Sequence, residues 1–454
     1  MSLQSVSPVT GQVLAEFQEH SDEEVDERLE RAARTFLSYR ETSYEDRSRW
    51  MTAAAELLEG EQPALAETIT LEMGKTFAQA KGEVSKCAMA FRWFADNAER
   101  LLDEEKVETS AKASVVRFDP LGPVLAIMPW NFPFWQVVRF AAPSLMAGNV
   151  VVLKHASNVS LTALSLESVF ARAGFPCGAF TTLLMNAGRV RNVIEDDRIT
   201  AVTLTGSEAA GRSVGQAAGA ALKKAVLELG GSDPFIVLAS ADLDRAVPVG
   251  VRARIQNNGQ SCIAAKRFLI DESVFDEYYH RFTDEMAALV LGDPFDPATD
   301  VGPLSSRAQR DEVAGQVDDA VAKGATISCG GSLLDGAGWF YPPTVITGVT
   351  SSMRISREEV FGPVAVVEKV RGVEDAIREA NRTVFGLGAS VWTQDREEAD
   401  RCVAGVEAGQ VFVNAMVAST PELPFGGIKR SGYGRELSSF GLKEFCNAKS
   451  VWIA

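Results

Sequence analysis

Histidine, paired cysteines and long apolar runs are the features that this sequence lacks most clearly. Only three histidines occur in 454 residues, at His20, His155 and His280, which argues against multi-histidine metal sites and against a Cys-His or Ser-His catalytic couple. The six cysteines stand singly, at Cys87, Cys177, Cys262, Cys329, Cys402 and Cys446. Because no C-x-x-C pair occurs among them, zinc ribbons and thioredoxin-like motifs have no support, and we expect no metal site.

Basic charge is also in short supply. The chain carries 45 lysines and arginines against 61 acidic residues, a net charge of −16. Such a surface repels phosphate backbones and anionic lipid, so we expect neither a nucleic-acid nor a membrane partner. No apolar run approaches the ~20 residues that span a bilayer, and the first residues lack a basic flank before an apolar stretch. These features predict a cytoplasmic protein without a disulfide framework.

The composition is that of a globular α/β protein. With 46% hydrophobic and 23% charged residues, the chain is long enough for about three domains or two large ones. A capping box, Ser21-x-x-Glu24, opens a helical region that continues to about residue 104. A short alternating stretch, 113–118, predicts a strand outside the main sheet.

Short apolar runs alternate with helical segments from Gly122 onward, which predicts parallel, doubly wound sheets. A helix at 274–289 is expected to start after Ser273 as its N-cap. A break near Gly230-Gly231 separates two α/β units. The predicted strands are 124–128, 150–153, 181–184 and 201–205 in the first unit, and 235–238, 268–270, 364–367, 389–392 and 410–414 in the second.

Two turns follow predicted strands of the first unit, at the strand ends where open α/β sheets bind ligands. Pro129-Trp130-Asn131-Phe132-Pro133 is either a proline-stiffened turn or a place where the Asn131 amide can stabilise an oxyanion. Leu204-Thr205-Gly206-Ser207, with Gly211 in the following helix, has the strand-to-helix geometry of a phosphate site, although it is not G-x-G-x-x-G.

A carboxylate and a cysteine stand out by their local context. Glu228 lies within an apolar strand, Ala225 to Leu229, so it is either an edge-strand residue facing water or a general base with a raised pKa. Cys262 follows a polar lead-in, Asn257-Asn258-Gly259-Gln260-Ser261. A lone cysteine is most often a small buried hydrophobe, whereas this lead-in is unlike a core segment.

The order of these motifs resembles the aldehyde dehydrogenase superfamily over essentially the whole chain. The resemblance is carried by the Asn131 turn, Lys154, the glycine turn, Glu228 with Gly230-Gly231, and Cys262. Two further motifs carry it, Glu359-Val360-Phe361-Gly362-Pro363 and Pro424-Phe425-Gly426-Gly427-Ile428-Lys429. It implies that Cys262 is the nucleophile and that Asn131 and the Cys262 backbone N–H bind the oxyanion. Glu228 is then the base that activates the hydrolytic water.

The same resemblance implies a nicotinamide cofactor and the residues that bind it. Lys154 is expected at the adenosine ribose, Glu359 at the nicotinamide ribose and Phe361 beside the nicotinamide. The other expected cofactor residues are Trp130, Ser157, Gly206, Ser207 and Gly211. Many NAD-preferring members carry Glu three residues after the lysine, where this chain has Ser157. Because serine does not repel a 2′-phosphate, we expect NADP to be accepted. The alternative is a neutral serine with use of both NADP and NAD.

The substrate is predicted from details around the motifs, which resemble bacterial succinate-semialdehyde dehydrogenases. Arg139, eight residues after Asn131, matches a position facing the substrate tunnel and could bind a carboxylate. A surface arginine that caps a helix is the alternative. A second arginine found in some members is Gln256 here, and Ser419 is a possible replacement partner.

Other functions remain open at this stage. They are a broad aldehyde dehydrogenase of detoxification and a non-catalytic descendant of the fold. A CoA-acylating enzyme is disfavoured because Glu228 is present.

Domain limits follow from the resemblance. A Rossmann-like cofactor-binding domain is expected at 1–104 and 120–230, and an α/β catalytic domain at 231–439. Segments 105–119 and 440–454 are expected to be oligomerisation arms of a homodimer or homotetramer.

Overall fold

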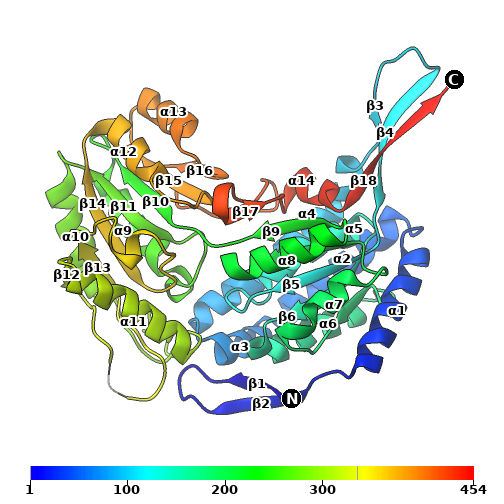
Figure 1. Ribbon diagram of the computed structural model, residues 1–454, viewed down its shortest axis with the longest axis horizontal. Helices are drawn as coiled ribbons and strands as arrows, with labels where there is room; N and C mark the ends of the chain where they lie inside the picture. The colour runs from blue at the N-terminus through cyan, green and yellow to red at the C-terminus, as the bar shows by residue number, and fades with distance from the viewer. Residues whose placement is uncertain (1, 335) are drawn as a thin grey trace.

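The structure is a computed structural model that describes residues 2–334 and 336–454. Two α/β lobes lie side by side, and a narrow arm projects from one of them (Figure 1). The first lobe contains the N-terminal half of the chain, and the second contains most of the rest. This arrangement confirms the predicted α/β class with parallel sheets.

The first lobe is built on a sheet of order β17-β9-β8-β5-β6-β7. Its strands are β5 (Pro123–Met128), β6 (Val150–His155), β7 (Phe180–Thr182), β8 (Ala201–Thr205), β9 (Lys224–Glu228) and β17 (Gly432–Tyr433). All neighbours pair in parallel except β17, which pairs antiparallel with β9. From β5 the chain proceeds to one side through β6 and β7, and then crosses to β8 and β9. The carboxyl end of β5 is therefore a topological switch point, where such sheets form a ligand crevice.

Helices cover both faces of this sheet (Figure 1). They are α1 (Asp22–Tyr39), α2 (Tyr44–Gly60), α3 (Gln62–Met73), α4 (Phe77–Leu101), α5 (Trp135–Met146), α6 (Ser160–Arg172), α7 (Val190–Glu195), α8 (Glu208–Ala220) and α14 (Ser438–Glu444). The predicted capping box is confirmed, because Ser21 and Glu24 exchange hydrogen bonds between side chain and backbone at the start of α1. A hairpin of β1 (Ser2–Val6) and β2 (Val13–Gln18) precedes these helices.

The second lobe has a sheet of order β12-β13-β14-β11-β10-β15-β16. Its strands are β10 (Asp233–Val237), β11 (Ala265–Asp271), β12 (Thr326–Cys329), β13 (Thr344–Thr347), β14 (Val364–Val370), β15 (Gly388–Trp392) and β16 (Gln410–Val413). Its helices are α9 (Leu243–Ile255), α10 (Phe275–Ala287), α11 (Arg307–Ala322), α12 (Gly372–Asn381) and α13 (Arg396–Gly405). The sequence predicted five of these strands and missed β12 and β13.

Two details of the sequence predictions need correction. The predicted catalytic domain, 231–439, contains β17, yet β17 completes the sheet of the first lobe by pairing with β9. The helix α14 begins within the same range and lies against α4 and α5 of that lobe. Ser273 does not cap α10: its hydroxyl donates to Asp271 at 2.5 Å, and the N-cap residue is Val274. A carboxylate two residues away satisfies the serine locally.

The arm is a separate antiparallel sheet of order β18-β4-β3. Its strands are β3 (Glu105–Lys106), β4 (Ala113–Pro120) and β18 (Cys446–Ile453), so β18 brings the C-terminal segment beside β4 along its full length. This confirms that 113–118 is a strand outside the main sheets. Large apolar side chains are exposed on the arm, including Trp452 at 59% and Ile453 at 53%. None of the helices in the described part of the chain is long and apolar enough to cross a membrane.

Candidate active site

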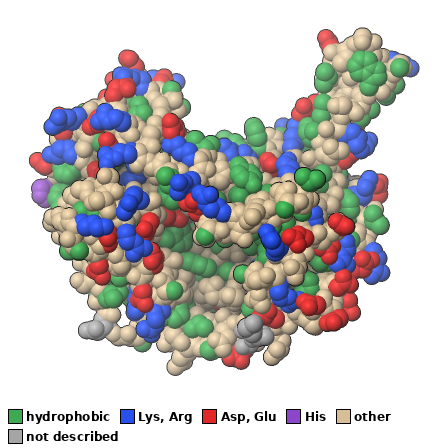
Figure 2. Space-filling view, viewed as in Figure 1, with side chains coloured by type: hydrophobic (Ala, Val, Ile, Leu, Met, Phe, Trp, Pro, Cys, Tyr) green, Lys and Arg blue, Asp and Glu red, His purple; other side chains and the backbone are tan. Residues whose placement is uncertain are grey.

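The predicted catalytic residues converge between the two lobes, where Figure 2 shows the surface hollowed and lined by apolar side chains. Asn131 follows β5 and Glu228 ends β9, so both lie at the carboxyl edge of the first sheet. Cys262 comes from the second lobe, in the turn between α9 and β11. A narrow cavity of about 90 Å³ opens at Cys262 and continues toward Arg139 and Ser419.

The turn before Cys262 depends on two asparagines with left-handed backbone conformations. Asn257 and Asn258 have φ values of 58° and 57°, a region that asparagine adopts more readily than most residues. Their side chains also satisfy buried carbonyls: Asn257 Nδ2 donates to Asn131 O at 2.7 Å, and Asn258 Nδ2 donates to Gly74 O at 2.9 Å. The polar lead-in seen in the sequence therefore ties the cysteine turn to the first lobe.

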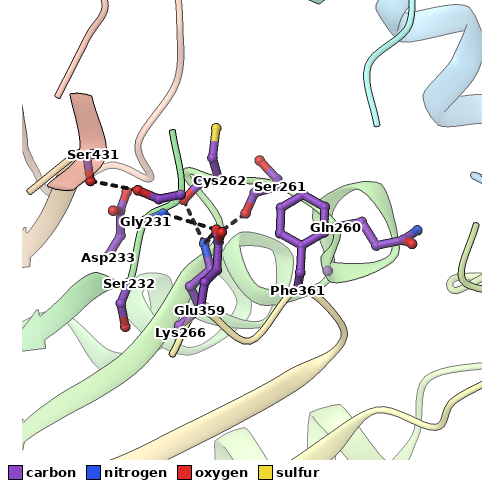
Figure 3. Close-up of polar contacts among 12 residues, drawn as sticks. Gly231, Ser232, Asp233, Gln260, Ser261, Cys262, Lys266, Glu359, Phe361 and Ser431 are labelled. Carbon is purple, nitrogen blue, oxygen red and sulfur yellow. Dashed lines mark hydrogen bonds and ion pairs between the residues drawn. The ribbon is translucent and has the colours of Figure 1, made fainter. Parts of the chain in front are cut away.

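Lys266 fixes the backbone of the cysteine turn from below. Its Nζ donates to Ser261 O at 2.9 Å and to Cys262 O at 2.6 Å, and it forms an ion pair with Glu359 at 3.2 Å. Figure 3 shows these contacts on one side of the turn, with the Cys262 sulfur pointing away from them. Because both carbonyls are held by Lys266, the thiol is directed out of the turn.

The Cys262 thiol is protonated in this state. Burial raises its pKa to about 12, although the positive charges of Arg139 and Lys266 act in the opposite direction. The thiolate is the nucleophilic form, so a proton must leave the sulfur when substrate and cofactor are in place. The cysteine is partly exposed and free, which does not fit the alternative of an inert core residue.

Two N–H groups face the same region as the thiol. The Asn131 side chain is 4% exposed, and one of its amide hydrogens donates to Gln260 O at 3.1 Å. An amide nitrogen carries two hydrogens, so a second donor remains. The backbone N–H of Cys262 donates to no residue that the structure describes. Together these two groups are the donor pair expected for an oxyanion.

Glu228 is buried without a hydrogen-bond partner. Its side chain is 1% exposed, so the alternative of an edge residue facing water is wrong. Neither carboxyl oxygen has a partner among the described residues, and a Cβ on Gly426 would come within 2.7 Å of Oε1. Burial raises the pKa of Glu228 to about 8, against the opposing charge of Arg139. A carboxyl group with a pKa near neutrality suits a general base.

Arg139 lines the cavity, but its charge is already matched. The side chain is 2% exposed, which rules out the surface-arginine alternative. Its Nε forms a very short ion pair with Glu436, and its Nη2 donates to Thr205 at 3.2 Å. The guanidinium also stacks on the Phe425 ring at 4.2 Å. If Arg139 binds a substrate carboxylate as predicted, it must do so with a guanidinium that already forms an ion pair with Glu436.

The predicted phosphate and adenosine residues lie at the carboxyl edge of the first sheet. Lys154 is the second-last residue of β6, and Ser157 is exposed just after the strand ends. Ser207 is the N-cap of α8, and its hydroxyl accepts from Ala210 N at 3.3 Å. Gly211 packs so closely on Leu229 that a Cβ would approach within 2.5 Å. Gly206 is joined to β9 through Glu228 O at 2.9 Å.

The predicted nicotinamide residues lie on the other side of the crevice. The Glu359 carboxylate accepts from Gly231 N at 3.1 Å, in addition to its ion pair with Lys266. Phe361 meets Trp130 edge to face, with ring centroids 5.7 Å apart. The predicted site residues thus lie around the crevice between the lobes. Ser419 lines the cavity at Cys262.

Comparison with known proteins agrees with this geometry. The sequence profile of the aldehyde dehydrogenase family matches residues 1–451. The chain belongs to the aldehyde dehydrogenase family.

Named relatives of this aldehyde dehydrogenase cover its whole length. An NADP-type succinate-semialdehyde dehydrogenase of Mycobacterium tuberculosis is 56% identical over 457 aligned residues, covering 100% of both chains. The corresponding Mycobacterium avium enzyme is 55% identical and covers 100% of this chain and 97% of its own. The crystal structure of succinic semialdehyde dehydrogenase from Streptococcus pyogenes in complex with NADP⁺ has a TM-score of 0.97 at 38% identity, covering 99% of each chain.

Three residues important for this aldehyde dehydrogenase site were not assigned roles from the sequence. They are Lys266, Glu436 and His155. His155 joins β6 to the Asn131 turn through Pro133 O at 2.8 Å, and burial lowers its pKa to about 4. Lys266 could have been noticed, because a lysine inside an apolar strand four residues after the cysteine is unusual. Glu436 gave no comparable signal.

Proposed function

We propose that the chain oxidises succinate semialdehyde to succinate with NADP, through a thioester on Cys262. The observation that carries the proposal is a set of unsatisfied polar groups in one buried site. The Glu228 carboxyl lacks a partner, and the spare Asn131 N–H and the Cys262 N–H are available nearby. Buried polar groups are normally hydrogen-bonded, so groups left unpaired in a cleft are reserved for a ligand.

The first half-reaction uses the second-lobe turn. The Cys262 thiol releases its proton to solvent, and the sulfur then attacks the aldehyde carbon to form a thiohemiacetal. The spare Asn131 N–H and the Cys262 N–H stabilise the oxyanion that develops. A nicotinamide held beside Phe361 and Glu359 would supply the hydride acceptor, and transfer of the hydride from this carbon would leave a thioester on the Cys262 sulfur. Lys266 acts as a positioning residue, because it fixes the carbonyls of Ser261 and Cys262.

The second half-reaction uses the first-lobe carboxylate. Glu228 takes a proton from a water molecule, whose oxygen attacks the thioester carbon. The carbon–sulfur bond breaks and the carboxylic acid leaves. The sulfur then takes the proton that Glu228 accepted from water, which returns both groups to their starting state. The raised pKa of Glu228, about 8, makes it a much better proton acceptor than an exposed glutamate.

The residues at the edge of the first sheet fit a dinucleotide with a 2′-phosphate. Trp130 follows β5, Ser207 follows β8 and Lys154 lies near the carboxyl end of β6, and these three strands are adjacent at the switch point. The exposed N-terminus of α8 offers N–H groups to a diphosphate. Ser157 brings a hydroxyl and no negative charge, which accommodates a 2′-phosphate. Lys154, with its pKa lowered by burial, supplies the nearby cation.

The arm supports an assembly of identical subunits. Trp452 and Ile453, near the end of β18, expose large apolar side chains on a sheet of only three strands. Such a sheet gains stability when another subunit covers it. We therefore propose a homodimer or homotetramer joined through the arms, which size-exclusion chromatography with light scattering would test.

Steady-state kinetics with a panel of aldehydes tests the proposal. Succinate semialdehyde, butanal and hexanal are assayed with NADP and with NAD separately. We expect the highest kcat/KM for succinate semialdehyde with NADP. A higher kcat/KM for the neutral aldehydes would favour the detoxification alternative, and no cofactor reduction with any aldehyde would favour a non-catalytic descendant.

A further inference from the structure

The cavity at Cys262 is also lined by a lysine that the sequence did not single out. Lys86, on α4, lies against Trp135 with its Nζ 4.1 Å from the ring centroid, and it donates to Ser419 Oγ at 2.9 Å. Cys262, Lys86 and Ser419 all line this cavity. One cavity of about 90 Å³ is thus lined by both the reacting sulfur and a cation.

Lys86 and Lys75 differ in how their charges are balanced. Lys75 is fully buried and forms a very short ion pair with Glu83, whose other oxygen accepts from the backbone of Phe134 and Trp135. Lys86 forms no ion pair with a carboxylate anywhere in the described part of the chain. A partly buried ammonium without a counter-ion is costly, so it calls for an anion from outside.

Ser419 has a hydrogen to donate at the same place. Its oxygen accepts from Lys86 Nζ and from Trp135 Nε1, both at 2.9 Å. A hydroxyl oxygen has two acceptor positions and one O–H donor. With both acceptor positions used by the protein, the remaining Ser419 donor is available to a ligand.

We propose that Lys86, together with the Ser419 hydroxyl, binds the carboxylate of the substrate and so makes the enzyme selective for a short ω-carboxylated aldehyde. This inference rests on the proposed function and adds the residue that recognises the substrate. The ammonium supplies the charge and Ser419 supplies an oriented hydrogen bond. The cavity of about 90 Å³ between them and Cys262 suits a chain of few carbons.

The positive charge of Arg139 is already balanced by Glu436, unlike that of Lys86. Its guanidinium is engaged by Glu436, Thr205 and the Phe425 ring. Turning it toward a substrate would leave Glu436 as a buried carboxylate without a partner. Arg139 therefore acts as a positioning residue on the wall of the cavity, and Lys86 is the cation left over for a ligand.

The state of Lys86 without substrate is consistent with this role. Burial lowers the pKa of its ammonium to about 8, with the positive charges of Arg139 and Lys75 acting in the same direction. The lysine is still mainly protonated at neutral pH. A substrate carboxylate beside it would favour the charged form further.

Lys86→Met tests the inference, because it keeps the length of the side chain and removes its charge. Wild type and variant are assayed with succinate semialdehyde and with butanal, which has four carbons and no carboxylate. We expect kcat/KM for succinate semialdehyde, divided by kcat/KM for butanal, to fall about 10–100-fold. The fall should come mainly from a higher KM for succinate semialdehyde. Lys86→Arg should restore much of the ratio. The matched control is Lys81→Met on the same helix, whose ammonium lies on Phe77 outside the cavity.

The outcomes separate this inference from the proposed function. A wild-type enzyme without preference for succinate semialdehyde over butanal would overturn the proposed substrate itself. A wild-type preference that survives in Lys86→Met would overturn Lys86 alone. Equal losses on both aldehydes would show that Lys86 is structural. If Lys86→Met does not fold, Ser419→Ala provides the second test, with a smaller fall of about 3–10-fold expected in the same ratio.

Discussion

The ionisable groups around the candidate active site include two ion pairs and two groups without a counter-ion. Lys75 pairs with Glu83 and Arg139 pairs with Glu436, and all four side chains are almost completely buried. Glu228 and Lys86 have no ion pair to a residue that the structure describes. The paired charges tie α4 and α5 to neighbouring segments, although Arg139 also lines the cavity at Cys262. Of the unpaired groups, Lys86 lines that cavity and Glu228 lies close enough to Cys262 to affect the pKa of its thiol. Around this cavity, the ionisable groups without a counter-ion are therefore the better candidates for contact with a ligand.

Loss of the Cys262 nucleophile should reduce turnover more than any other change. Cys262→Ala removes the atom that forms the covalent intermediate, while the contacts of Lys266 with the turn backbone remain possible. We expect turnover to fall by at least about 10³-fold with cofactor binding unchanged. Cofactor titration by fluorescence and steady-state assays measure both. Residual turnover within about tenfold of wild type would remove Cys262 from this role.

Loss of the unpaired carboxylate should separate the two half-reactions. Glu228→Gln keeps the shape of the side chain but cannot accept the water proton, so we expect a burst of one reduced cofactor per subunit and steady-state turnover about 10²–10⁴-fold lower. In wild type the ionised form is the active base, so steady-state hydrolysis should rise with pH and level off above the Glu228 pKa of about 8. Stopped-flow assays across this range measure both effects.

The contribution of Glu228 to stability has the opposite pH dependence. Its folded-state pKa is raised, so the stabilising effect is present below the unfolded-state pKa of about 4.5 and is lost as pH rises toward about 8. Glu228→Gln should be free of this loss.

A pH profile of activity that is the same in wild type and variant would show that another group activates the water.

Disruption of a paired charge should affect stability before selectivity. Arg139→Ala leaves Glu436 buried without a partner, so we expect the free energy of unfolding to fall by about 3–5 kcal/mol and both aldehydes to be affected alike. The double variant Arg139→Met/Glu436→Leu, which removes both charges, should recover most of that stability. A normal stability with a loss restricted to succinate semialdehyde would instead support Arg139 as the carboxylate clamp. Denaturant unfolding and the two aldehyde assays distinguish these results.

The smallest expected effect concerns the cofactor. Ser157→Glu adds a carboxylate that repels a 2′-phosphate and accepts from free ribose hydroxyls, so we expect the NADP-to-NAD ratio of kcat/KM to fall about 10–100-fold. Ser157→Gln, similar in size but neutral, is the control and should change the ratio much less. If NADP efficiency survives the added charge, the 2′-phosphate binds elsewhere.

Much of the first sheet could be predicted from sequence because its strands are short apolar runs between helices. The predicted strand 201–205 coincides with β8, and the predicted 124–128 differs from β5 by one residue. The two-residue strand β17 could not be found in this way. It pairs with β9, some 200 residues earlier in the chain, and no local sequence pattern indicates such a long-range pairing.

The site was predictable in part for the same reason. Asn131, Glu228 and Cys262 belong to motifs with a recognisable order. Lys86 and Glu436 have meaning only through their partners, or the lack of them, in three dimensions. The α4 sequence around Lys86 is rich in alanine and predicts only a packed helix. Neither segment alone indicates that Arg139 pairs with Glu436, or that Lys86 has no carboxylate partner among the described residues.

Mass spectrometry of the Glu228→Gln variant tests the central claim most directly. The variant is mixed with succinate semialdehyde and NADP, quenched in acid and digested. We predict a peptide containing Cys262 that has gained one succinyl group, in proportion to the reduced cofactor formed. Reduced cofactor without acylation of Cys262, or acylation of another cysteine, would contradict the account.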